Sequence, residues 1–148
     1  MLKLRELKES DRALMENFWN SLTADTFRWW HHYGSVDDIF HEKSHKLIGL
    51  QNGKIVVYGF LLPDDNFPST PSLGIVTSEE ERGKGLGTKM LKALEKVARK
   101  KGYKNIFLTA YIENKGAVRF YNKMGYEIRS VVKRRAGLAY AMKKKLKP

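Results

Sequence analysis

The chain has 148 residues, of which 42% are hydrophobic and 11% aromatic, and this composition suits one compact domain over residues 1–148 with a buried core. It contains no cysteine, which excludes a disulfide framework, thiolate metal ligands and catalysis through a covalent cysteine intermediate. No apolar run approaches the ~20 residues needed to cross a bilayer, and the amino terminus does not resemble a secretion signal. We therefore expect a cytoplasmic protein with no membrane partner.

The positive charge is concentrated at the carboxyl end. The 28 Lys and Arg outnumber the 16 Asp and Glu, giving a net charge of +12. Eight of the basic residues and none of the acidic ones lie in residues 128–148, so the other 20 basic and 16 acidic residues leave only +4. A nucleic-acid-binding module would depend on this last segment alone. We expect no nucleic-acid partner but keep such a module as an alternative of another class.

The first half of the chain predicts a strand, two helices and a hairpin. Residues 2–7 alternate between apolar and polar, which is typical of a strand. A helix is expected to begin at Ser10, and a second, short one after Ser35. In residues 45–62 the pair Asn52-Gly53 separates two apolar stretches, which predicts a hairpin with a type I′ turn.

The second half predicts strands alternating with helices. A helix that ends at Gly102 and a helix capped by Asn114 that ends at Gly125 are flanked by four predicted strands, at residues 73–77, 105–111, 126–133 and 137–146. The complete order predicts a mixed sheet with helices over its faces.

A glycine-rich segment, RGKGLG at residues 82–87, lies between a predicted strand and the start of a predicted helix. Its glycines let backbone N–H groups approach an anion, and the helix dipole favours negative charge there. The spacing is neither GxxxxGK[ST] nor GxGxxG, because Thr88 stands where each of these patterns needs a glycine. Taken alone, the segment is equally well explained as a glycine-rich turn.

A second group of residues follows on the helix after the next strand. Asn114, Ala117 and Tyr121 are three and four residues apart, so they share one face of that helix. The alternative is that both residues are purely structural, with Asn114 capping the helix and Tyr121 packing in the core.

In combination, Arg82-x-x-Gly85-x-Gly87 and Asn114-x-x-Ala117-x-x-x-Tyr121-x-x-x-Gly125 resemble the GNAT superfamily of acyl-CoA-dependent N-acyltransferases. The resemblance implies an α/β (α+β) fold with a mixed, mostly antiparallel central sheet of six to seven strands. Helices would cover both faces, and a V-shaped cleft would open between two central strands.

The resemblance also implies an N-acetyltransferase that moves an acetyl group from acetyl-CoA, its co-substrate, to a primary amine by direct attack in a ternary complex. The main chain of Ile75, Val76 and Thr77 would bind the pantetheine arm and polarise the thioester carbonyl. Asn114 would steady the pantetheine, and the Tyr121 hydroxyl would protonate the leaving thiolate. The pyrophosphate would be held by the amides of Arg82, Gly83, Lys84, Gly85, Leu86, Gly87 and Thr88.

The general base is unassigned. Members of the family that acetylate protein amino termini often carry a glutamate five residues before the motif asparagine, where this chain has Thr109. Others carry one in the strand before the pyrophosphate loop, and residues 73–77 contain no carboxylate. The acids Glu79, Glu80 and Glu81 come later, in what we interpret as a solvated loop.

The acceptor pocket is implied to lie between the first two helices and the last hairpin, which makes Trp29, Trp30 and His31 candidate substrate-binding residues. Histidine can take up a proton near neutral pH. The alternative is that the tryptophans pack against the sheet while the histidines are exposed. Three of the four histidines lie within eleven positions, but no cysteine or paired acid accompanies them, so we expect no metal.

Two basic runs, at residues 133–135 and 143–145, flank the last hairpin. They are either a solvated edge-strand face or an attraction for an acidic acceptor or for the CoA phosphates. The acceptor would be a small-molecule amine or a protein amine. Two alternative functions are acetylation of protein amino termini or lysines and a non-catalytic acyl-CoA sensor. A homodimer is a further alternative for the assembly.

Overall fold

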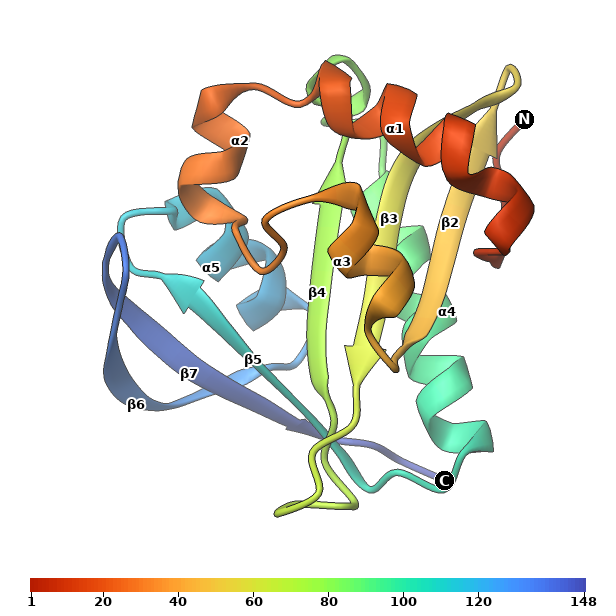
Figure 1. Ribbon diagram of the computed structural model, residues 1–148. Coiled ribbons are helices and arrows are strands. Elements are labelled where there is room, and N and C mark those ends of the chain that lie inside the picture. The colour runs from red at the N-terminus through yellow and green to blue at the C-terminus, as the bar shows by residue number, and fades with distance from the viewer.

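The structure is a computed structural model that describes all 148 residues (Figure 1). Its seven strands form one sheet in the order β1-β2-β3-β4-β5-β7-β6, and all neighbours are antiparallel except β4 and β5. The expected mixed, mostly antiparallel sheet is thus confirmed. The strands are β1 (Lys3–Glu6), β2 (His45–Gln51), β3 (Lys54–Leu62), β4 (Ser72–Thr77), β5 (Asn105–Tyr111), β6 (Glu127–Arg134) and β7 (Gly137–Lys145).

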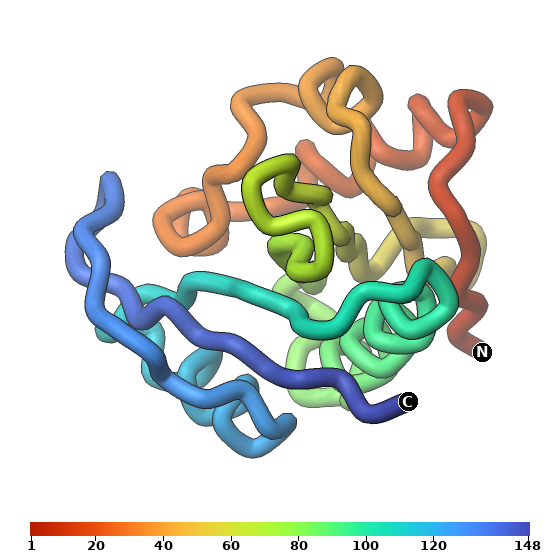
Figure 2. The backbone as a smooth tube through the Cα atoms, turned by 90° about the horizontal axis from the view of Figure 1, so that it is seen from below, coloured from red at the N-terminus to blue at the C-terminus, as the bar shows by residue number.

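Helices cover both faces of the sheet. Figure 2 shows α2 and α3 on one side of β5 and β7, with α4 and α5 on the other. None of the helices combines the length and the apolar character that crossing a bilayer requires. The helices are α1 (Arg12–Ser21), α2 (Ala24–Trp29), α3 (Val36–His41), α4 (Leu86–Lys100) and α5 (Lys115–Lys123), with 3₁₀ turns at Glu9–Asp11 and Glu79–Glu81.

The segment between β1 and β2 holds three helices where the sequence predicts two. The additional helix is α2, and the Thr23 hydroxyl accepts the Thr26 amide at 3.4 Å as its cap. The aromatic run at residues 27–33 overlaps the second half of α2, and because it has no helical periodicity it hides this helix in the sequence. The predicted type I′ turn is confirmed, because Asn52 and Gly53 both have positive φ, 53° and 74°.

Two apolar cores lie on the two faces of the sheet. Under α1 and α3, the side chains of Met15, Ile39 and Tyr58 have no exposed surface. Under α4, Met90 and Leu94 are equally buried against β3. They fit because β3 has Gly59 there: a Cβ on this residue would lie 2.8 Å from atoms of both side chains.

The last basic run does not lie on an edge strand, so that interpretation of it is wrong. It lies in β7, which is an interior strand, whereas the edge strand is β6. Lys144 points inward, and its Nζ donates to Glu95 Oε2 at 3.0 Å and to the Met124 carbonyl at 2.9 Å. Glu95 is only 4% exposed and also accepts the Tyr126 hydroxyl at 2.9 Å. This cluster joins α4, β7 and the end of α5.

Replacing Lys144 by Gln leaves the Glu95 carboxylate buried without its cation. We expect the free energy of unfolding to fall by about 1.5–3 kcal/mol, the usual contribution of a hydrogen bond to a charged group. Lys145→Gln is the matched control, because Lys145 is exposed and should change stability by less than about 0.5 kcal/mol. Urea unfolding of both variants tests this. Equal midpoints for the two variants would contradict the role given to Lys144.

Candidate functional site

The strands β4 and β5 separate almost as soon as they meet. Their parallel pairing consists of Ser72 with Phe107 alone, whereas β3 and β4 pair over six residues. Beyond this point β5 turns away from β4, as Figure 1 shows. The expected V-shaped opening between two central strands is therefore present.

The edge of β4 that faces this opening carries backbone groups without strand partners. The Ser78 amide donates to the Val56 carbonyl on the β3 side at 2.9 Å. Because alternate residues of a strand direct their backbone groups to the same neighbour, Val76 also bonds toward β3. The N–H and C=O groups of Ile75 and Thr77 therefore point into the opening. The role expected for the Val76 main chain does not fit this register.

The glycine-rich segment presents a row of free amides at the start of α4. The first helical bond runs from the Lys89 amide to the Gly85 carbonyl at 3.2 Å, and no side chain caps the helix. The six amides from 83 to 88 donate to no other group of the protein. Gly83 and Gly85 adopt φ of 80° and 79°, and a Cβ on either would meet no atom within 4 Å. Open space and free N–H groups at a helix amino terminus suit an anion.

Two side chains at the start of this loop, those of Glu79 and Arg82, form hydrogen bonds with α2. The Thr26 hydroxyl is 4% exposed, donates to Glu79 at 2.6 Å and accepts from Arg82 Nη2 at 2.7 Å. Glu79 also accepts the Thr23 hydroxyl. The interpretation of the acids at 79–81 as a solvated loop is wrong for Glu79, while Glu81 does pair with Lys84 at 2.8 Å at the surface.

Asn114 and Tyr121 lie on α5, behind the opening. Asn114 is the cap residue by position, but its side chain makes no capping bond and remains free for a ligand. Tyr121 is half-buried beside Phe120 and Tyr126, and its hydroxyl bonds to no protein group. Burial raises the pKa of Tyr121, so the hydroxyl keeps its proton through the neutral and alkaline range.

Across the sheet, α2 and the last hairpin border a cavity of about 190 Å³. Trp29 lies 5.4 Å from the Tyr111 ring, measured between centroids, and His31 Nε2 lies 2.6 Å from the Tyr111 hydroxyl. The candidates Trp29 and His31 therefore meet at one place. The sequence analysis missed Tyr111. It could have been found because the even-numbered residues of β5 face the core under α4, so an odd-numbered tyrosine at the end of this strand must face the other side. The cavity is lined by Trp29, Tyr111, Ile112, Glu113, Ala136, Gly137 and Leu138.

Trp30 lies elsewhere than expected. Its ring packs at 6.1–6.3 Å from Trp19 and Tyr58, inside the core under α1, so it does not line this cavity. Here the alternative, packing against the sheet, holds. The other histidines are dispersed: His32 pairs with Glu42 at 2.7 Å, and His45 lies 3.0 Å from the Tyr103 hydroxyl. No three His, Asp or Glu side chains are placed to hold a metal ion.

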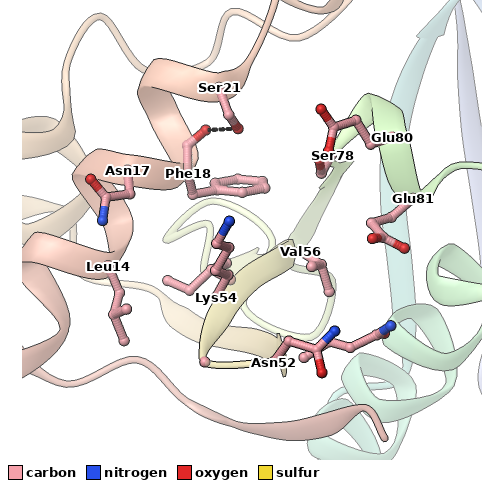
Figure 3. A pocket seen from close by; sticks show the side chains of 13 residues that line it. Leu14, Asn17, Phe18, Ser21, Asn52, Lys54, Val56, Ser78, Glu80 and Glu81 are labelled. Carbon is pink, nitrogen blue, oxygen red and sulfur yellow. Dashed lines mark hydrogen bonds between the residues drawn. The ribbon is translucent and has the colours of Figure 1, made fainter.

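A larger hollow of about 660 Å³ lies between α1 and the β2–β3 turn (Figure 3). Its charged side chains are Lys54, Glu80 and Glu81, and polar groups such as Asn17 and Asn52 line the rest. The two carboxylates make it a poor place for an anionic ligand, and it does not reach the free amides at the start of α4.

The acetyltransferase (GNAT) family matches residues 4–126 of the chain. The uncharacterized N-acetyltransferase MJ1207 of Methanocaldococcus jannaschii is 36% identical over 89 residues. That match covers 55% of this chain and 38% of the relative, so the chain corresponds to less than half of that protein's length.

Solved structures show the same fold. A GNAT-family acetyltransferase from Streptococcus pneumoniae superimposes with a TM-score of 0.84 at 24% identity, covering 99% of this chain and 100% of that one. The aminoglycoside acetyltransferase AAC(6')-Ib in complex with coenzyme A gives a TM-score of 0.77 at 22% identity, covering 98% and 95%. The family match over most of the chain, together with the splayed strands and the open amide row, shows that this chain belongs to the acetyltransferase (GNAT) family.

Proposed function

We propose that the protein is an acetyl-CoA-dependent N-acetyltransferase that transfers the acetyl group to a primary amine by direct attack in a ternary complex. The observation that carries this proposal is the presence of two sets of unpaired backbone donors beside the opening. One set is Ile75 and Thr77 on β4, and the other is the amides of residues 83–88. Few other ligands would use both an extended edge and an anion site at a helix amino terminus.

Each part of acetyl-CoA has a counterpart beside the opening. The amide groups of the pantetheine arm would pair with the free edge of β4, as an added strand does. The pyrophosphate would accept the amides of residues 83–88, where the glycines leave room for it. The free side chain of Asn114 would bond to the pantetheine from the α5 side. No step in this arrangement requires a metal.

The Tyr121 hydroxyl would supply the proton that the leaving thiolate takes up. Its raised pKa keeps it protonated at every pH at which the enzyme would be assayed, and it has no competing partner inside the protein. The amine, attacking from the α2 side, would meet the thioester across the opening. The sulfur would then leave toward α5.

Acetyl-CoA should raise the melting temperature of the protein in proportion to the logarithm of its concentration above Kd. Gly85→Asp would place a carboxylate among the free amides and should abolish this shift. Gly102→Asp is the matched control, because Gly102 also has a positive φ of 83° and open space, but lies at the far end of α4. Differential scanning fluorimetry with millimolar acetyl-CoA gives the answer. A wild-type protein that shows no shift would overturn the proposal.

Tyr121→Phe removes the hydroxyl and keeps the packing against Phe120 and Tyr126. Loss of a general acid typically costs about 10²–10⁴ in rate, so kcat should fall by this factor while acetyl-CoA affinity stays within a few-fold. Because the pKa of Tyr121 is raised, wild-type kcat should show no alkaline decline from loss of this proton below about pH 10. Tyr140→Phe, on β7, controls for loss of an unpaired phenol. Equal kcat in wild type and Tyr121→Phe would exclude the general-acid role.

The acceptor is the open part of the proposal. A screen of CoA release against small amines, amino acids, polyamines, aminoglycosides and peptides would identify its class. Turnover with peptides alone would favour acetylation of protein amino termini or lysines. Binding of acetyl-CoA without turnover on any amine would indicate an acyl-CoA sensor and contradict catalysis.

A further inference from the structure

A tyrosine and a histidine that are 80 positions apart in the sequence form a pair on the acceptor side of the opening. Tyr111 is the last residue of β5, is 7% exposed, and faces away from the core under α4. His31 follows α2 and is half-buried, with its Nε2 at 2.6 Å from the Tyr111 hydroxyl. The Trp29 ring packs on Tyr111 from the same helix and limits where the phenol can move.

The pair stands level with the free edge of β4. The only β4–β5 register pair is Ser72 with Phe107, and Tyr111 lies four residues beyond Phe107. Val76 lies four residues beyond Ser72. Its two neighbours, Ile75 and Thr77, direct their backbone groups into the opening. Tyr111 and this edge therefore border the opening at the same height, from opposite strands.

The hydrogen bonds around Tyr111 allow it to donate its proton to His31. The Ala136 amide donates to the Tyr111 oxygen at 3.2 Å. The hydroxyl keeps its one proton for another partner, and His31 Nε2 is the other polar atom of the protein within reach. If the hydroxyl donates to Nε2, the ring proton of His31 is on Nδ1, which bonds to no protein group. The phenol oxygen keeps a lone pair for a donor in the cavity.

The one carboxylate that lines this cavity is that of Glu113. The strands β4 and β5 contain no Asp or Glu, and the exposed Glu113 is held by Arg28 at 3.4 Å. Arg28 itself lies over the Trp29 ring, 4.5 Å from its centroid. Imidazole is the side chain that exchanges a proton between pH 5 and 8.

We infer that Tyr111 and His31 remove the proton from the acceptor amine, with Tyr111 as the catalytic residue that contacts the amine and His31 as the positioning residue that takes the proton. This inference rests on the proposed N-acetyltransferase activity. As the amine nitrogen bonds to the acetyl carbon, its proton passes to the Tyr111 oxygen, and the Tyr111 proton passes to His31 Nε2. The carbon–sulfur bond breaks, the thiolate takes a proton from Tyr121, His31 returns its proton to solvent, and Tyr121 takes up a proton from solvent.

The first test needs no acceptor. Nitrogen-15 NMR of histidine-labelled protein at pH 8 should show His31 protonated on Nδ1 and unprotonated on Nε2. Tyr111→Phe, which removes the proton donor to Nε2, should abolish this preference, and His32, paired with Glu42, serves as an internal reference. A wild-type His31 that carries its proton on Nε2 would overturn the inference, because it would then be donating to Tyr111.

The second test uses the acceptor with the fastest CoA release in the screen. His31→Gln keeps an oxygen that can accept the Tyr111 hydroxyl but cannot take a proton at neutral pH, so kcat should fall by about 10²–10⁴. The fall of wild-type kcat at acid pH, which reports protonation of the base in the bound complex, should be missing from this variant. His32→Gln is the matched control and should keep wild-type kcat and pH profile.

The outcomes separate the two proposals. A His31→Gln variant within three-fold of wild-type kcat, with the same pH profile, overturns this inference and leaves the acetyltransferase intact. A wild type without turnover on any acceptor contradicts the proposed function. The NMR measurement of the His31 tautomer would then be the test of whether the Tyr111–His31 pair is arranged to accept a proton.

Discussion

The separation of β4 from β5 after one residue pair is the constraint on which the rest of the structure depends. A parallel pair that continued would have used the backbone groups of Ile75 and Thr77 in the sheet. Their release exposes polar groups in the middle of a sheet, which costs free energy unless a ligand or water satisfies them. The unpaired N–H and C=O groups of β4 are therefore suited to a ligand with amide-like groups. The same separation sends the end of β5 toward α2, where Tyr111 meets Trp29 and His31.

Two strand groups held together by so little pairing need other connections, and the structure has one on each face. On the α4 side, the buried pair of Glu95 and Lys144 joins α4, which packs on β3 and β4, to β7 in the other half. Its further bonds, to Tyr126 and to the Met124 carbonyl, fix the end of α5. On the other face the contact of α2 with Tyr111 performs the same task. An opening bordered by rigid, cross-linked walls holds its donors in place before the ligand arrives, which reduces the cost of ordering them on binding.

The sequence predicts those parts of the fold that depend on local patterns. The hairpin at Asn52-Gly53, the glycine segment before α4 and the helix after Asn114 each have a short-range physical signal, and all three are in the structure. The missed elements depend on tertiary placement. Trp29 and Trp30 are adjacent and chemically identical, and only the packing of α2 sends one to the cavity and the other to the core. Likewise, a run of three lysines in a sequence predicts a solvated surface, whereas in the structure the middle one, Lys144, bonds to the buried Glu95 of α4.

The start of α4 offers an anion both backbone donors and side-chain charge. Arg82 bonds to the neutral Thr26 hydroxyl and forms no ion pair, while Lys84 is paired with Glu81 at the surface. The aligned amides and the dipole of α4 would add a directional attraction for a diphosphate placed at the helix axis. Thr26 bonds to Glu79 and Arg82 at once, so α2, which carries Trp29, moves with the loop that bears these amides. The loop with the free amides and the cavity beside Trp29 are therefore connected through α2, and a shift of either would disturb the other.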